Sequence, residues 1–135
     1  MSIIQRHTDI PTGYQCPLCS CRTGDSAFRV SQVVGAAICE GCDFELSHFL
    51  ELDERENDPV LDALEAFTGV SFKEARRRYH REAIAIFQYK LLPENVDREV
   101  AEEVKHTKRT AVETIAHWRT IIRDYEEALQ RLETQ

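Results

Sequence analysis

Glycine and proline are scarce in this chain, and both are unevenly placed. Only five of its 135 residues are glycine and only four are proline. Four of the glycines precede residue 50, and neither residue type occurs after Pro93. Because glycine and proline are the residues that most often interrupt helices, we expect long helices in the C-terminal part.

Long hydrophobic runs are also missing. No run approaches the roughly 18 apolar residues of a membrane-spanning helix. The opening segment MSIIQRHTDIPTGY lacks the apolar core and the small-residue cleavage site of a signal peptide. We therefore expect a cytoplasmic protein without a membrane segment. In that reducing compartment, paired cysteines are metal ligands or redox groups more often than structural disulfides.

Basic residues are fewer than acidic residues in this chain. The chain has 17 Lys and Arg against 24 Asp and Glu, which gives a formal net charge of -7. Hydrophobic residues make up 42%, an ordinary value for a soluble globular protein. An acidic surface repels nucleic acid and anionic membranes on average, and it suits a basic protein partner.

Groups that would indicate an enzyme are absent from the sequence pattern. We find no paired carboxylates, no nucleophile beside a base, and no glycine-rich phosphate loop of the GxxxxGKS or GxxxxGKT type. The isolated His and Asp residues are interpreted as solvated side chains. We therefore expect no enzymatic activity.

Five cysteines lie between residues 16 and 42, and four of them follow the spacing C-x2-C-x19-C-x2-C. This spacing is typical of a zinc site in which each pair forms a knuckle and the intervening residues form a hairpin. Four thiolates complete a tetrahedral shell and leave no open position for catalysis. We expect one structural zinc per chain, bound by Cys16, Cys19, Cys39 and Cys42.

Two other uses of these cysteines stay open. An iron–sulfur cluster also takes four thiolates, and a redox pair would need a surrounding α/β fold that this short segment cannot supply. Zinc is favoured over both. The spare Cys21 is interpreted as a small side chain beside the knuckle, with a redox sensor or an alternative ligand as the other readings. His7 and His48 are interpreted as surface or packing residues, because the four-cysteine set is complete.

The composition changes near residue 52, which predicts two domains. Residues 1–52 are expected to form a small α+β zinc module. Residues 53–135 are expected to form an all-α domain. The charged run ELDERENDP connects the two parts.

Capping residues divide the second domain into helices. Asp58 and Pro59 suit the N-cap and first position of a helix over residues 59–68, and Gly69 suits its stop. A capping box of the S-x-x-E type then opens a helix over residues 72–91.

A third helical stretch covers residues 94–133. Thr110 and Glu113 can form a capping box that restarts the helix after a break near 107–110. This stretch is therefore expected to form either one long helix or two shorter helices.

Apolar residues of this last stretch recur at heptad spacing from Ala111 onward. Each large apolar side chain left in water forfeits roughly 1.5–3 kcal/mol of burial. We expect the stripe to pack in a helical bundle, in preference to a free coiled coil, and to do so between two copies of the chain, as a homodimer. The alternative is that the preceding helices cover it within one chain. The residues expected at the interface are Ile115, Trp118, Ile122, Tyr125 and Leu129.

The segment VSQVVGAAICEGCDFELSHFL resembles the N-terminal zinc-binding domain of the ClpX unfoldase. Both have a strand, a glycine turn, a strand that runs into ICxxC, and then a helix. In that family four cysteines bind zinc in a treble-clef fold, and the domain dimerises and captures adaptors and substrates. The resemblance covers residues 16–50. The residues after it are too few for the ATPase module, so unfolding activity is not implied.

The resemblance also implies a surface for a partner on or near the helix after the second knuckle. We expect a non-enzymatic adaptor, inhibitor or immunity or antitoxin-like protein that binds another protein. The residues implied in that contact are Phe44, Leu46, Phe49 and Leu50.

The alternative function is a nucleic-acid-binding regulator that combines a zinc ribbon with the basic helix KEARRRYHR. On that helix Arg78 can pair with Glu74 and Glu82 at i,i+4 spacing. Arg77 and Arg81 would then stay unpaired and face away from the apolar side. The acidic balance of the whole chain disfavours phosphate contact, so protein binding is preferred.

Overall fold

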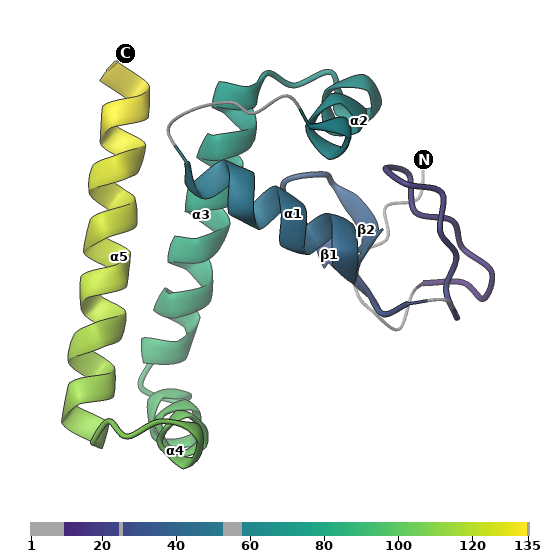
Figure 1. The fold of residues 1–135 in the computed structure, drawn as a ribbon. Coiled ribbons are helices and arrows are strands. Elements are labelled where there is room, and N and C mark those ends of the chain that lie inside the picture. The colour runs from purple at the N-terminus through teal and green to yellow at the C-terminus, as the bar shows by residue number, and fades with distance from the viewer. Residues whose placement is uncertain (1–9, 25, 53–57, 135) are drawn as a thin grey trace. The chain divides into compact units, whose positions relative to one another are not determined.

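The computed structural model describes residues 10–24, 26–52 and 58–134. His7 and residues 53–57 of the charged connector lie outside the described residues. The described chain forms a small antiparallel sheet followed by helices, which is the coarse fold class that the sequence predicts (Figure 1). In chain order the elements are β1 (Phe28–Ser31), β2 (Ala36–Cys39), α1 (Glu40–Glu51), α2 (Pro59–Thr68), α3 (Phe72–Leu91), α4 (Val96–His106) and α5 (Ala111–Thr134).

The elements group into two compact units, the first ending at Tyr79 and the second beginning at His80. Helix α3 therefore contributes residues 72–79 to the first unit and residues 80–91 to the second. None of the helices in the described part of the chain is both long enough and apolar enough to cross a membrane.

The first unit is built around a β-hairpin. β1 and β2 pair antiparallel, with Phe28 opposite Cys39 and Ser31 opposite Ala36. Gly35 closes the turn at a φ of 76°, a left-handed conformation that glycine adopts without a Cβ clash. Its N–H donates to the Ser31 carbonyl at 2.8 Å. The register places Cys39 at the end of β2, directly before α1.

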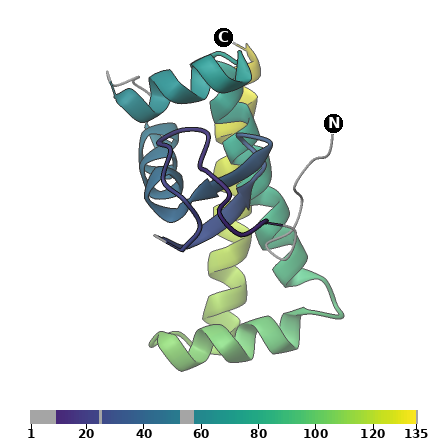
Figure 2. The same ribbon diagram turned by 90° about the vertical axis from the view of Figure 1, so that its right-hand side faces the viewer.

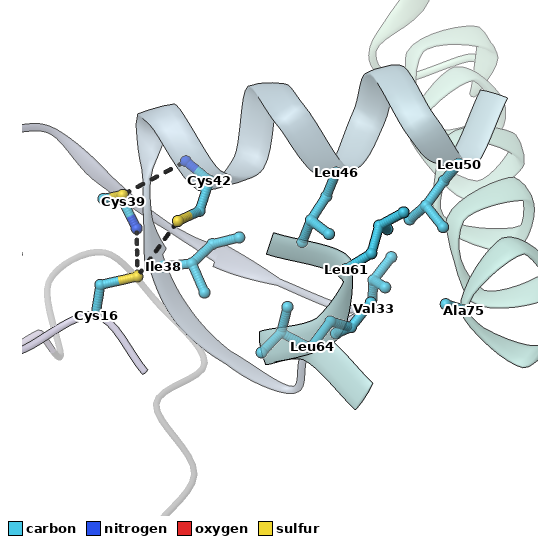
Figure 3. Close-up of a cluster of buried hydrophobic side chains, with 11 residues drawn as sticks. Cys16, Val33, Ile38, Cys39, Cys42, Leu46, Leu50, Leu61, Leu64 and Ala75 are labelled. Atoms are coloured by element: carbon cyan, nitrogen blue, oxygen red, sulfur yellow. Dashed lines mark hydrogen bonds between the residues drawn. The ribbon is translucent and has the colours of Figure 1, made fainter. Parts of the chain in front are cut away.

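Helix α1 packs on the hairpin through one face. Cys42, Leu46 and Leu50 are buried and recur every four residues, the spacing of one helical side. Ile38 of β2 belongs to the same hydrophobic core (Figure 3). Val33, which follows β1, is buried in that core as well.

The first unit extends beyond the predicted boundary near residue 52. Leu61 and Leu64 of α2 and Ala75 of α3 join the same core (Figure 3). Arg76 is buried, and its Nε donates to the Leu50 carbonyl at 3.2 Å. The physical reason is that α2 and α3 add apolar surface to the core of a segment that is small by itself. The domain boundary near residue 52 stays a prediction.

In the second unit the C-terminal half of α3 runs antiparallel to α5 (Figure 1). The rings of His80 and Tyr125 lie 5.3 Å apart, and those of Phe87 and Trp118 lie 6.5 Å apart. Trp118 is buried, and the Lys90 Nζ lies 5.1 Å from its ring centroid. That distance is typical of a cation–π contact.

The long C-terminal stretch forms two helices, α4 and α5, separated by residues 107–110. Thr110 and Glu113 form the capping box at the start of α5. The Glu113 N–H donates to Thr110 Oγ1 at 3.2 Å, and the Thr110 N–H donates to Glu113 Oε1 at 3.0 Å. Figure 2 shows α4 running across the beginning of α5.

Candidate metal centre

The four predicted ligands meet at one end of the hairpin. Cys16 and Cys19 precede β1, Cys39 ends β2, and Cys42 lies in the first turn of α1. Their Sγ atoms all lie within 4.8 Å of one another. The Cys19–Cys39 and Cys16–Cys42 Sγ distances are 3.4 and 4.0 Å. Zn–S bonds of about 2.3 Å in a tetrahedron separate the sulfurs by about 3.8 Å. The prediction that these cysteines come together is confirmed, and the group can hold one metal ion.

The centre is shielded from solvent on most sides. Cys16, Cys39 and Cys42 are buried, and only Cys19 is exposed. Their buried sulfurs belong to the core shown in Figure 3, so the centre and the apolar packing of the first unit are continuous. An ion bound there would tie the first knuckle to α1, because Cys16 and Cys42 are 26 positions apart in the sequence.

Backbone N–H groups point at two of the sulfurs. Cys39 is the N-cap of α1, and its Sγ accepts from the Cys42 N–H at 3.4 Å. The Cys39 N–H donates to Cys16 Sγ at 3.5 Å. The positive end of a helix macrodipole also favours negative charge at this position. These N–H groups are placed to donate to thiolates, the form in which cysteine binds metals.

The first knuckle is a tight backbone turn. The Cys16 N–H donates to the Cys21 carbonyl at 2.7 Å, and the Ser20 N–H donates to the Cys16 carbonyl at 2.9 Å. Ser20 adopts a φ of 71°, a left-handed conformation that costs an L-residue roughly 1 kcal/mol. This turn directs the Cys16 and Cys19 thiols toward the second pair.

Burial and the neighbouring thiols oppose the ionisation of Cys42. Burial raises the pKa of Cys42, and hydrogen bonds with the Cys19 and Cys39 thiols raise it further. A divalent cation at the centre of the four sulfurs would reverse this effect, because it stabilises the thiolates directly. Metal binding at this centre is therefore coupled to proton release.

The fifth cysteine lies beside the knuckle. Its Sγ is 3.9 Å from Ser26 Oγ. Partial burial raises the pKa of Cys21 to about 12, with further contributions from the Cys39 and Cys19 thiols. A thiol with such a pKa stays protonated at neutral pH, which suits a packing residue better than a nucleophile.

Two contacts that support the centre were not predicted from the sequence. Arg29 Nη1 donates to both carboxylate oxygens of Asp43, at 2.9 and 3.1 Å, and joins β1 to the turn that holds Cys42. The Tyr14 hydroxyl donates to the Ala37 carbonyl at 3.0 Å. The partners are 14 and 23 residues apart, so no local pattern in the sequence predicts these two contacts.

The four residues implied for a partner contact divide between the core and the surface. Phe44 is 75% exposed, whereas Leu46 and Leu50 are 3% and 0% exposed. Phe49 is partly buried, with its ring edge-on to His48 at 5.1 Å. Leu46 and Leu50 are core residues, because they share the face of α1 that packs on the hairpin.

The expectation that Arg77 and Arg81 are unpaired is wrong. Arg77 lies 3.3 Å from a Glu74 carboxylate oxygen, and Arg78 lies 3.7 Å from the other oxygen of that carboxylate. Arg81 lies 3.3 Å from Glu133. The second pair depends on α5 returning alongside α3, and helical spacing within α3 does not reveal it.

The residues expected at a dimer interface differ in how far they are buried. Trp118 is buried and faces Phe87 of the same chain. The other four are partly buried, and self-association stays a prediction that involves them: Ile115, Ile122, Tyr125 and Leu129.

No protein-family model, curated protein or solved structure matches this chain. The resemblance to the ClpX zinc-binding domain therefore depends only on the segment quoted above.

Proposed function

We propose that this chain is a non-enzymatic, zinc-stabilised module that binds another protein. The observation that carries the proposal is Phe44, a large apolar side chain exposed on the helix that begins at the metal centre. The four cysteines and the charged residues around Phe44 also support the proposal.

The chemistry of the donor set favours zinc. Four cysteine sulfurs in a mostly buried, closed arrangement are typical of structural zinc sites. An open coordination position, which catalytic zinc sites keep, would need a ligand set of three. The order of knuckle, hairpin, second knuckle and helix is also that of the treble clef, which supports the likeness to the ClpX domain.

The exposed side of α1 has the character of a small protein-binding surface. One turn on either side of Phe44 lie Glu40 and His48, both exposed, and Glu45 is exposed next to it. Aromatic anchors contribute much of the affinity at protein interfaces, and the neighbouring carboxylates favour a basic partner. We call the residues Glu40, Phe44, Glu45 and His48 the α1 face.

This surface fits an adaptor, an inhibitor or an immunity or antitoxin-like protein. In each of these the chain acts by occupying a partner's surface, and zinc holds α1 in place. The alternative of a zinc ribbon with a basic helix is weaker, because Arg77 is only partly exposed and lies 3.3 Å from Glu74.

A binding experiment with matched variants tests the proposal. Zinc-loaded wild type, Phe44→Ala and Tyr89→Ala are immobilised, and proteins captured from the native host are quantified by mass spectrometry. Tyr89 is the control because it is a 55% exposed aromatic residue of the second unit. Loss of a hot-spot aromatic costs about 2 kcal/mol, or about thirtyfold in affinity.

The expected result is a specific partner that Phe44→Ala loses and Tyr89→Ala retains. Equal capture by all three proteins would contradict the α1 face as the binding surface. Elemental analysis of each variant shows whether the metal centre is intact.

A further inference from the structure

Positive charge is concentrated in one segment of the second unit. Residues 105–123 contain five Lys or Arg and a single acid, Glu113, whereas the rest of the chain contains 12 Lys or Arg and 23 Asp or Glu. The net charge of the whole chain conceals this concentration. A local basic surface, not the average charge, determines whether phosphate groups are attracted at short range.

The basic side chains of this segment are all at the surface. Lys105, Lys108 and Arg109 lie at the end of α4 and in the following turn, and Arg119 and Arg123 lie on α5. All five are exposed. We call these five residues the basic patch.

Neighbouring acids neutralise the basic patch only weakly. Lys105 lies 3.5 Å from Glu102, and Arg123 lies 3.9 Å from Asp124. Exposed pairs of this kind contribute about 0–1 kcal/mol, so a phosphate can displace them. The carboxylate of Glu113 already accepts the Thr110 N–H at the helix cap.

The backbone presents the basic patch on a helix-turn-helix arrangement. α4 ends at His106 and α5 begins at Ala111, and Figures 1 and 2 show the two helices crossing at a steep angle. In DNA-binding proteins with two helices joined in this way, the second helix lies in the major groove and the first crosses the backbone.

Small side chains lie on the outward side of α5 along its first turns. Val112, Ala116 and Thr120 recur every four residues and are all exposed, Val112 at 77%. Arg119 and Arg123 are exposed and project from the same side of the helix, because they lie seven and eleven residues after Val112. The major groove of B-DNA, which is about 12 Å wide, admits an α-helix, and small outward side chains allow the helix to approach closely.

We infer that the basic patch and the outward side of α5 form a binding surface for duplex DNA. Lys105, Lys108 and Arg109 contact backbone phosphates, while Arg119 and Arg123 reach the groove or its edges. Duplex RNA is a poorer fit, because its deep, narrow major groove does not admit a helix.

The same surface is poorly suited to an acidic protein. Protein interfaces are enriched in aromatic residues and Met at their centre. Among the exposed residues of the segment 105–123, the largest apolar side chain is Val112. The surface thus carries positive charge but lacks a large apolar side chain that could anchor a protein partner.

This inference is independent of the proposed function, because the basic patch and the α1 face belong to different units. It also uses residues other than Arg77 and Arg81. A chain with both surfaces would bring a protein partner to DNA.

Fluorescence anisotropy of a labelled duplex of about 25 base pairs tests the inference. The full zinc-loaded chain is titrated at about 50 and about 150 mM salt, with three variants beside the wild type. Arg119→Ala/Arg123→Ala removes part of the basic patch on the helix, and Lys108→Gln/Arg109→Gln removes the part in the turn. Arg81→Ala/Arg131→Ala removes the same charge from the second unit outside the basic patch. Circular dichroism melts verify that each variant is folded.

We expect saturable binding that weakens steeply with salt. Each double variant in the basic patch should weaken binding at least about tenfold and reduce the slope of log affinity against log salt by about two. The matched control should bind like the wild type.

Three results would overturn the inference. The first is no saturation at about 50 mM salt up to about 100 µM protein. The second is equal weakening by the control and by the variants in the basic patch. The third is tighter binding of a labelled poly-glutamate than of the duplex, which would instead assign the surface to an acidic protein.

Discussion

Cys39 serves both as a candidate metal ligand and as the N-cap of α1. The two roles can be separated, because serine is a good N-cap residue but does not replace a thiolate in a zinc shell. Cys21 offers a matched comparison, since it lies beside the centre but outside the group of four sulfurs that lie within 4.8 Å of one another.

The first prediction follows from this difference. Wild type and Cys21→Ser should each contain about one zinc per chain, whereas Cys39→Ser should contain less than about a tenth of an equivalent. Removal of the metal should also lower the melting temperature of the first unit, because the ion ties Cys16 to α1. Elemental analysis and thermal melts measure both effects. A full zinc equivalent in Cys39→Ser, or iron in the wild type, would refute the assignment.

The helices show how local residues determine where elements begin. Val60 N–H donates to the Asp58 carboxylate at 2.8 Å, and Gly69 ends α2 in the left-handed conformation. At α5, a hydrogen bond from the Thr110 backbone N–H lowers the pKa of Glu113, and the Thr110 hydroxyl lowers it further. Ionised Glu113 therefore stabilises the start of α5.

The second prediction is a pH dependence of this cap. Because the folded state has the lower pKa, the stabilisation is present above the unfolded value of about 4.3 and is lost as the pH falls through the folded value. The melting temperature of the wild type should thus approach that of Glu113→Gln between about pH 5 and pH 3. Calorimetric melts across this range measure it. Glu126→Gln, an exposed change on the same helix, is the control, and a constant gap between wild type and Glu113→Gln would contradict the cap.

At the scale of the whole molecule, the second unit leaves part of its apolar surface uncovered. The half of α3 in this unit faces α5 through Phe87 and Trp118. Ile115, Ile122 and Leu129 recur every seven residues on one flank of α5 and are only partly buried. A second copy of the chain can cover this flank by forming a bundle.

The third prediction is therefore a homodimer. Light scattering at tens of micromolar should give about twice the chain mass of 15.6 kDa. Ile122→Glu should convert the dimer to a folded monomer that keeps its metal, because a buried unpaired carboxylate is costly. Gln130→Glu adds the same charge on the exposed side of α5 and should leave the dimer intact. A monomeric wild type would contradict the prediction.

The sequence by itself determined the features that depend on neighbours within a few residues. The spacing of Cys16, Cys19, Cys39 and Cys42 identified the candidate metal centre, because ligand type and knuckle geometry are local properties. Caps such as Thr110 with Glu113 likewise bond across three residues, so their positions can be predicted from the chain alone.

Only the tertiary structure decided the features that depend on distant segments. Leu46 and Leu50 belong to the core because the hairpin and α2 pack on their side of α1, and Arg81 is paired because Glu133 returns to it 52 residues later. The first unit ends at Tyr79 for the same reason, since burial of apolar surface from α2 and α3 defines its extent. Such contacts join residues far apart in the chain, and periodicity along one helix contains no information about which partner arrives on each side.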